Sequence, residues 1–226
     1  WSCRRDNESI MSIEKQISKI NKEIKEQAEL IAVSKTRSIE DINEAYNQGQ
    51  KKFGENRVQE IVDKFNKLPK DIEWHMIGHL QKNKVKYISE FISLIHSLDR
   101  LSLANEIDKN GKKHDKSIDC LIQIKISKEE SKFGLNIDEL DSFYNEVKMF
   151  KNINIIGLMG MATFTNDKML INDEFQEMGR LFKKMKAIDS NFKILSIGMS
   201  DDYLIGIQNG SNMIRVGSKI FGKRNY

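Results

Sequence analysis

The chain has 226 residues, of which 39% are hydrophobic and 31% are charged, with a single proline. This composition excludes a disordered or fibrous protein and is typical of a globular one. The formal net charge of +4 comes from scattered residues and gives no reason to expect a nucleic acid as partner. No apolar run approaches the length of a membrane span, so no membrane partner is expected either.

The N-terminal residues differ in sequence pattern from the rest of the chain. Residues 1–10 precede Met11 and share no pattern with the later residues, so we expect a non-native or unstructured leader. Residues 11–226 are expected to form one domain, because this length supplies one sizeable core. Two cysteines, Cys3 and Cys120, imply no disulfide framework, and the head lacks the apolar stretch of a signal peptide, which together favour a cytoplasmic protein.

In chain order, the first predicted element is an amphipathic helix over residues 11–27, where Ile13, Ile17, Ile20 and Ile24 recur at spacings of three and four. Apolar runs then alternate with helix-type segments. The predicted strands are residues 30–34, 52–54, 73–77, 94–97, 118–126, 153–159, 194–197 and 213–216. The predicted helices between them are residues 39–48, 58–66, 83–91, 100–110, 137–148, 171–188 and 202–208.

Eight strands separated by helices indicate a parallel sheet. An open dinucleotide-binding sheet should carry G-x-G-x-x-G after its first strand, whereas residues 35–38 read KTRS. We therefore predict an α/β fold, a single (β/α)₈ TIM barrel with an extra N-terminal helix. In such barrels the chemistry lies at the C-terminal ends of the strands, where the strand-to-helix loops meet.

Lys35 stands at that end of the first predicted strand. A lysine at the end of a buried strand is poorly hydrated, so its charged form is disfavoured and its amine is more nucleophilic. Lysines that form Schiff bases have this property. The alternative is that Lys35 only extends its charge into solvent from the strand end.

The loops after the seventh and eighth strands are predicted to bind a phosphate, as they frequently do in barrel enzymes. Each offers a glycine turn and a serine hydroxyl beside backbone N–H groups, with Ser200 in the first loop and Gly217 and Ser218 in the second. The alternative is that both are ordinary turns and helix caps. Arg215, within the last strand, then has three possible partners: a phosphate, a pyridine nitrogen, or a carboxylate such as Asp201 or Glu55.

Seven segments resemble the pyridoxal phosphate homeostasis protein family in sequence and in order. They are residues 32–36 (AVSKT), 53–56 (FGEN), 74–81 (WHMIG and LQ around His79), 131–134 (SKFG), 157–159 (GLM), 195–202 (LSIGMSDD) and 215–222 (RVGSKIFG). That family is similar in fold to the barrel domain of alanine racemase, a type III pyridoxal phosphate protein. His79 replaces the proline that the family's pattern has most often.

The resemblance implies that pyridoxal 5'-phosphate (PLP) is the cofactor and that Lys35 carries it as a Schiff base. It also implies that Ser200, Gly217 and Ser218 hold the phosphate and that Arg215 faces the pyridine nitrogen. Asn56 and Met159 belong to matching motifs near the cofactor. The implied function is intracellular homeostasis of PLP by buffering, delivery or sensing, with PLP-dependent apoenzymes or amino acids as further partners.

Catalysis by the chain itself is not expected. An arginine partner disfavours a protonated ring nitrogen and so weakens the electron sink, and racemisation needs a second base besides Lys35. The sequence ends after the last barrel segment, so no C-terminal β domain that would supply this base is expected. The alternative function is a weak PLP-dependent amino-acid racemase or lyase that uses a water, His75 or Tyr203.

Two further expectations concern metals and assembly. His75 and His79 are four residues apart, but they flank Gly78 at a strand end without a nearby carboxylate in the usual pattern, so no metal site is predicted. A barrel without an added domain is compatible with a monomer or a weak dimer.

Overall fold

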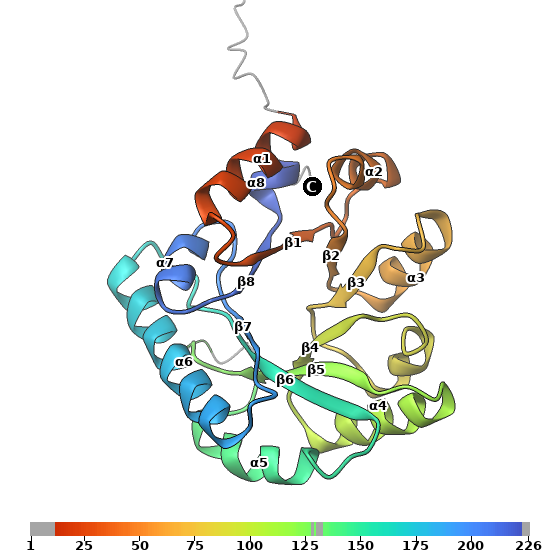
Figure 1. Cartoon of the computed structure of the whole chain (residues 1–226), viewed down its shortest axis with the longest axis vertical. Helices are drawn as coiled ribbons and strands as arrows, with labels where there is room; N and C mark the ends of the chain where they lie inside the picture. The colour runs from red at the N-terminus through yellow and green to blue at the C-terminus, as the bar shows by residue number, and fades with distance from the viewer. Residues whose placement is uncertain (1–11, 128, 130–132, 223–226) are drawn as a thin grey trace, which may run out of the picture.

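The computed structural model describes residues 12–127, 129 and 133–222. Within these residues eight parallel strands close into a barrel in sequence order, and the last strand pairs with the first. The helices lie around the outside of the strands (Figure 1). The predicted (β/α)₈ barrel is therefore confirmed. The expected leader, residues 1–10, lies outside the described residues.

All eight predicted strands are present, with ends within two residues of the prediction. They are β1 Glu29–Val33, β2 Lys52–Glu55, β3 Glu73–Met76, β4 Leu94–Leu98, β5 Ile118–Ile124, β6 Ile153–Gly160, β7 Ile194–Ser196 and β8 Met213–Val216. Buried residues run almost continuously along each of them, as expected for strands covered on both faces.

The helices of the outer ring follow the predicted segments closely, apart from the short last helix after the eighth strand, which was not predicted. They are α1 Ile13–Ile24, α2 Ile39–Asn47, α3 Val58–Lys67, α4 Leu101–Lys113, α5 Leu140–Val147, α6 Lys168–Ile188, α7 Tyr203–Gln208 and α8 Ser218–Phe221, with a short 3₁₀ helix η2 Ile137–Glu139 before α5. The extra helix α1 buries Ile17, Ile20 and Ile24 and packs against α2 and α8 (Figure 1). Among the described residues no helix is both long and apolar enough to cross a membrane.

One predicted helix has a different form. In place of an α-helix over residues 83–91 the structure has the 3₁₀ helix η1 Lys82–Tyr87, followed by turns. The backbone N–H groups of Lys84 and Ile88 bond to carbonyls three residues earlier. The apolar residues Val85, Ile88 and Phe91 are spaced by three, which matches the three residues per turn of a 3₁₀ helix.

The barrel interior is divided into an apolar layer and a polar layer. The apolar layer is a buried cluster formed by Ile31, Leu94, Leu121, Met159 and Met213. Residues two positions further along a strand point to the same side, one step nearer the C-terminal ends. Three of these are polar: His96 follows Leu94, Gln123 follows Leu121 and Arg215 follows Met213. The polar interior therefore lies directly below the loops at the C-terminal ends.

Candidate functional site

A cavity of about 470 Å³ opens at the C-terminal ends of the strands. Its size is ordinary for a small-molecule or cofactor site. It is lined by residues from the ends of β1, β2, β3, β5, β6, β7 and β8 and the loops that follow them, and six of the predicted site residues are among them: Lys35, Asn56, Ser200, Arg215, Gly217 and Ser218. Residues separated by up to 183 positions in the sequence thus share one cavity, because Lys35 and Ser218 follow adjacent strands (218 − 35 = 183).

A buried ionic cluster holds the backbone on both sides of Lys35. Lys64 of α3 donates from Nζ to the Ser34 carbonyl (2.8 Å), and Glu60 Oε2 accepts from the Thr36 backbone N–H (2.8 Å). Thr36 has a φ of 64°, in the left-handed region that non-glycine residues rarely adopt. These contacts fix the turn by which the half-buried Lys35 leaves β1 and reaches the cavity.

The same cluster buries a carboxyl group at the end of β2. Glu55 is fully buried, and its Oε1 accepts from Lys64 Nζ (2.6 Å) and from Ser34 Oγ (2.6 Å). Burial raises the pKa of Glu55 to about 7, although the Lys64 charge and the two hydrogen bonds oppose that rise. Glu55 is therefore buried next to the C-terminal end of β1, where it forms an ion pair with Lys64 and accepts a hydrogen bond from Ser34.

The loops after β7 and β8 are joined to one another. Gly198 begins the first loop with a φ of 98°, a left-handed conformation suited to glycine. Ser200 Oγ accepts from the Gly217 backbone N–H at 3.2 Å, which ties the two loops together. A Cβ on Gly217 would lie 3.2 Å from the Val33 carbonyl oxygen, so glycine lets this loop approach the end of β1.

Arg215 is buried at the floor of the cavity, with only 3% of its surface exposed. Its Nη1 donates to the Ser196 carbonyl (2.8 Å) and Oγ (2.5 Å), and its Nη2 donates to the Gly160 carbonyl (2.9 Å). Burial lowers the pKa of Arg215 to about 10, which leaves it charged at pH 7, and the charge of Asp202 opposes the change. Among the described residues, its hydrogen bonds go to neutral oxygens and not to the carboxylates of Asp201 or Glu55.

Met159 has a different location from the other predicted site residues. It is fully buried in the apolar layer of the barrel, whereas Met161, two residues further along the chain, lines the cavity. A cofactor role for Met159 stays a prediction.

The lining also includes four residues that sequence reasoning missed: Arg37, Gln123, Phe133 and Met161. A signal for Gln123 was present in the sequence, because it is a polar residue inside an apolar strand. Phe133 lies in a loop, where no periodicity marks it.

Three of the four histidines lie in or beside the barrel interior, in two separate places. His75 and His96 are buried within the barrel, with His75 Nδ1 2.9 Å from His96 Nε2. His79 lies at the cavity wall and stacks on Phe133 with ring centroids 3.9 Å apart. Its Nδ1 is buried without a hydrogen-bond partner in the described part of the chain, 3.9 Å from Asp99 Oδ2. In that same part no group of three or more metal-ligating side chains occurs.

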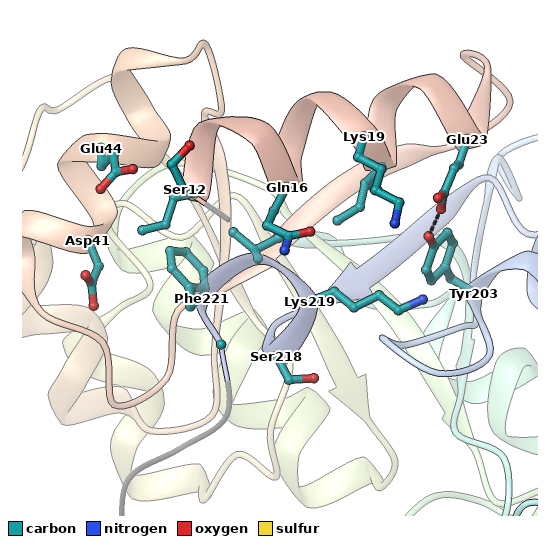
Figure 2. Close-up of a pocket in the computed structure, with 14 residues that line it drawn as sticks. Ser12, Gln16, Lys19, Glu23, Asp41, Glu44, Tyr203, Ser218, Lys219 and Phe221 are labelled. Carbon is teal, nitrogen blue, oxygen red and sulfur yellow. Dashed lines mark hydrogen bonds between the residues drawn. The ribbon is translucent and has the colours of Figure 1, made fainter. Parts of the chain in front are cut away.

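Tyr203 borders a second hollow, outside the barrel mouth. This groove of about 920 Å³ lies between α1, α2 and α8, and Figure 2 shows the Tyr203 hydroxyl directed at Glu23 of α1. The hydroxyl donates to Glu23 Oε2, and Lys219 lies over the Tyr203 ring, 4.8 Å from its centroid. Burial, together with Glu23, raises the pKa of Tyr203. These contacts place Tyr203 away from the lining of the barrel-mouth cavity.

The chain is similar to proteins of known sequence along most of its length. Residues 9–225 match the family described as "Alanine racemase, N-terminal domain". The chain is 39% identical over 202 residues to the pyridoxal phosphate homeostasis protein of Pasteurella multocida, which covers 87% of both chains. It is 38% identical over 202 residues to the protein of the same name from Aquifex aeolicus, with 88% of both chains covered.

Solved structures share the fold. PipY of Synechococcus elongatus without PLP matches with a TM-score of 0.88 and 30% identity, covering 93% of this chain and 100% of that one. PipY with PLP bound matches with a TM-score of 0.85 and 29% identity over the same shares. An alanine racemase of Clostridium difficile, 12% identical with a TM-score of 0.78, covers 95% of this chain and 56% of its own, and shares the fold alone.

Proposed function

The chain belongs to the pyridoxal phosphate homeostasis protein family, and we propose that it binds PLP at the barrel mouth and takes part in intracellular PLP homeostasis. The observation that carries the proposal is the convergence of Lys35, Arg215 and the two serine loops on one cavity. The PLP-bound structure of PipY, a relative of the same fold, supports it. The buried free thiol of Cys120 suits a reducing cytoplasm, where we place this role.

The donors around the cavity fit the three polar parts of PLP. Lys35 supplies the amine for a Schiff base with the aldehyde. Ser200 and Ser218 offer hydroxyl donors for the phosphate, and Gly217, whose backbone N–H donates to Ser200 Oγ, is proposed to hold the phosphate as part of the loop that joins them. Asn56 borders the same cavity and is proposed as a further contact.

Arg215 determines what the bound cofactor is suited for. PLP supplies an electron sink, which acts best when its ring nitrogen is protonated. A guanidinium is a donor only, so it hydrogen-bonds an unprotonated ring nitrogen and disfavours the added proton. The proposed role is therefore to hold and release PLP, with apoenzymes or amino acids as recipients, more than to catalyse turnover.

The alternative, a weak amino-acid racemase or lyase, needs a second acid–base group. The two side chains first considered for that role lie elsewhere, because His75 is buried below the cavity and Tyr203 bonds to Glu23 outside it. His79, in contrast, lines the cavity with one buried ring nitrogen free of hydrogen bonds among the described residues. It is the residue to test for this function.

Titration of the protein with PLP, followed by absorbance, tests binding. The wild type should bind one equivalent, Lys35→Ala should lose the Schiff-base band, and Lys19→Ala, an exposed lysine on α1, should behave as the wild type. The loaded protein should then restore activity to an apoenzyme of the PLP-dependent class. Failure of the wild type to bind PLP would contradict the proposal.

Stereospecific deuterium exchange on free amino acids separates the alternatives. Holding and release predict no sustained exchange, whereas sustained exchange that is lost in His79→Asn would favour the racemase or lyase.

A further inference from the structure

Four polar side chains form a hydrogen-bonded chain across the barrel interior. His75 of β3 meets His96 of β4 (2.9 Å), His96 Nδ1 meets Ser196 Oγ of β7 (3.1 Å), and Ser196 Oγ accepts from Arg215 of β8 (2.5 Å). None of the four is more than 3% exposed. Burying a polar group costs free energy unless the group is hydrogen-bonded. A hydrogen-bonded series of four buried side chains from four strands therefore calls for a reason beyond packing.

The position of each proton in this chain follows from its charged end. Arg215 can only donate, so Ser196 Oγ accepts from it, and because the described residues offer this hydroxyl no other acceptor, its own proton goes to His96 Nδ1. His96 then carries its proton on Nε2 and donates it to His75 Nδ1, which in turn puts the His75 proton on Nε2. The chain therefore has one direction, and both imidazoles have one definite tautomer.

Both imidazoles are also held neutral. Burial lowers the pKa of His75 to about 3, and Lys52 adds a smaller effect in the same direction. Burial also lowers the pKa of His96 well below its usual value, and His75 and Arg215 lower it further. A proton on either ring would place a second positive charge close to the guanidinium and would reverse one hydrogen bond of the chain.

The chain also limits which donors of Arg215 remain available. A guanidinium has five N–H donors. Within the described residues, three hydrogen bonds, two to Ser196 and one to Gly160, leave two of these donors without a protein partner, and Arg215 borders the cavity. Ser196 and the Gly160 carbonyl therefore set the rotation of the guanidinium plane, and His96 orients the hydroxyl of Ser196.

We propose that His75, His96 and Ser196 are positioning residues for Arg215, a one-way hydrogen-bond chain that fixes which guanidinium donors face the ring nitrogen of the bound cofactor. This inference rests on the proposed function of the cavity and deepens it. The chain keeps the ring nitrogen paired with a rigid donor, which favours stable holding of PLP.

The first test uses the wild-type protein without cofactor. Nitrogen-15 NMR between pH 5 and pH 8, with the ring signals assigned to individual histidines, should show His75 and His96 as neutral imidazoles with the proton on Nε2. Titration of either of these two rings in this range, or a proton on its Nδ1, would overturn the inference whether or not PLP binds.

The second test uses Ser196→Ala, with Ser196→Thr as the conservative variant that retains the hydroxyl. The matched control is Ser211→Ala, which removes an equally buried hydroxyl that donates to the Ile197 carbonyl (2.6 Å). Because a hydrogen bond to a charged group is lost, PLP should bind about tenfold more weakly to Ser196→Ala. The nitrogen-15 shift of the bound cofactor ring should change as well, Ser196→Thr should recover both values, and Ser211→Ala should change neither.

The outcomes distinguish a failure of this inference from a failure of the proposed PLP-binding function. If the wild type binds PLP and Ser196→Ala leaves both the affinity and the ring-nitrogen shift unchanged, the inference is wrong and the proposed function stands. If the wild type does not bind PLP, the proposed function is wrong, and the positioning role falls with it even where the histidine tautomers are as expected.

Discussion

Replacing Lys64 by methionine removes the cation of the buried cluster beside Lys35. The Lys64 side chain is 8% exposed and donates to Glu55 Oε1, the Ser34 carbonyl and Glu60 Oε2 at 2.6, 2.8 and 3.1 Å. Methionine keeps the apolar stem and leaves all three acceptors without this donor. Loss of one partner from a buried ion pair typically destabilises a protein by about 3–5 kcal/mol.

The pH dependence of this loss identifies its origin. The pKa of Glu55 is about 7 in the folded protein and 4.5 as a free group, so the stability it contributes is present below pH 4.5 and is lost as the pH rises through 7. The Lys64 charge holds this pKa down, so it rises further in the variant. The deficit relative to the wild type should therefore be larger at pH 8 than at pH 5.

Urea unfolding at both pH values measures this deficit. With a slope of about 2–3 kcal/mol per M, the midpoint of Lys64→Met at pH 8 should fall by about 1–2 M. Lys51→Met is the matched control, because its salt bridge to Asp71 (2.7 Å) is half exposed on both sides and should shift the midpoint little. A deficit that is the same at pH 5 and pH 8, or no larger than that of the control, would refute the reasoning.

Three further outcomes are expected. Gly157→Ala should destabilise the fold by more than about 3 kcal/mol in thermal unfolding, because the new Cβ would lie 1.8 Å from the Ile194 carbonyl oxygen; near-wild-type stability would contradict the packing of β6 on β7. Because the pKa of His75 is about 3 in the folded protein and 6.5 as a free group, its contribution should lower the free energy of unfolding by about 2 kcal/mol as the pH falls from 7.5 to 5. In urea titrations over this pH range, His75→Gln should therefore lose about 2 kcal/mol less stability than the wild type, and an equal loss would speak against a neutral ring. Gly217→Ala should weaken PLP binding about fivefold, equivalent to about 1 kcal/mol, because its Cβ would lie 3.2 Å from the Val33 carbonyl oxygen and the loop must shift to relieve that contact; unchanged affinity in a PLP titration would argue against this loop as the phosphate site.

Much of the fold was predictable because the local signals agree. Eight β-type runs alternate with helical periodicity, and each run reappears as a strand of the barrel. The helix type over residues 83–91 was harder to predict, because apolar residues three apart fit both an α-helix and a 3₁₀ helix. Tertiary packing selected the 3₁₀ helix.

The candidate site was predictable where the strand ends carry it. Lys35, Ser200, Arg215 and Gly217 each stand at or just after a predicted strand, and barrel closure brings them to one cavity. Pairing between distant side chains was not predictable. The contact of His96 with Ser196 spans 100 positions in the sequence. It depends on the register of the strands in the closed barrel, which no local sequence pattern reveals.

The side-chain partners of buried charges were likewise hidden. Glu55 was considered as a partner of Arg215, whereas the structure pairs it with Lys64, nine residues away across the β2–α3 turn. Met161 was missed for a related reason, since only the depth of each residue inside the barrel distinguishes it from Met159.

Lys35 is the residue proposed to hold PLP. Borohydride reduction of the PLP-loaded protein, followed by peptide mass mapping, identifies the lysine that forms the Schiff base. The expected result is loss of the Schiff-base absorbance and a single pyridoxyl adduct on Lys35. An adduct on another lysine, or no adduct in protein that binds PLP, would contradict the account.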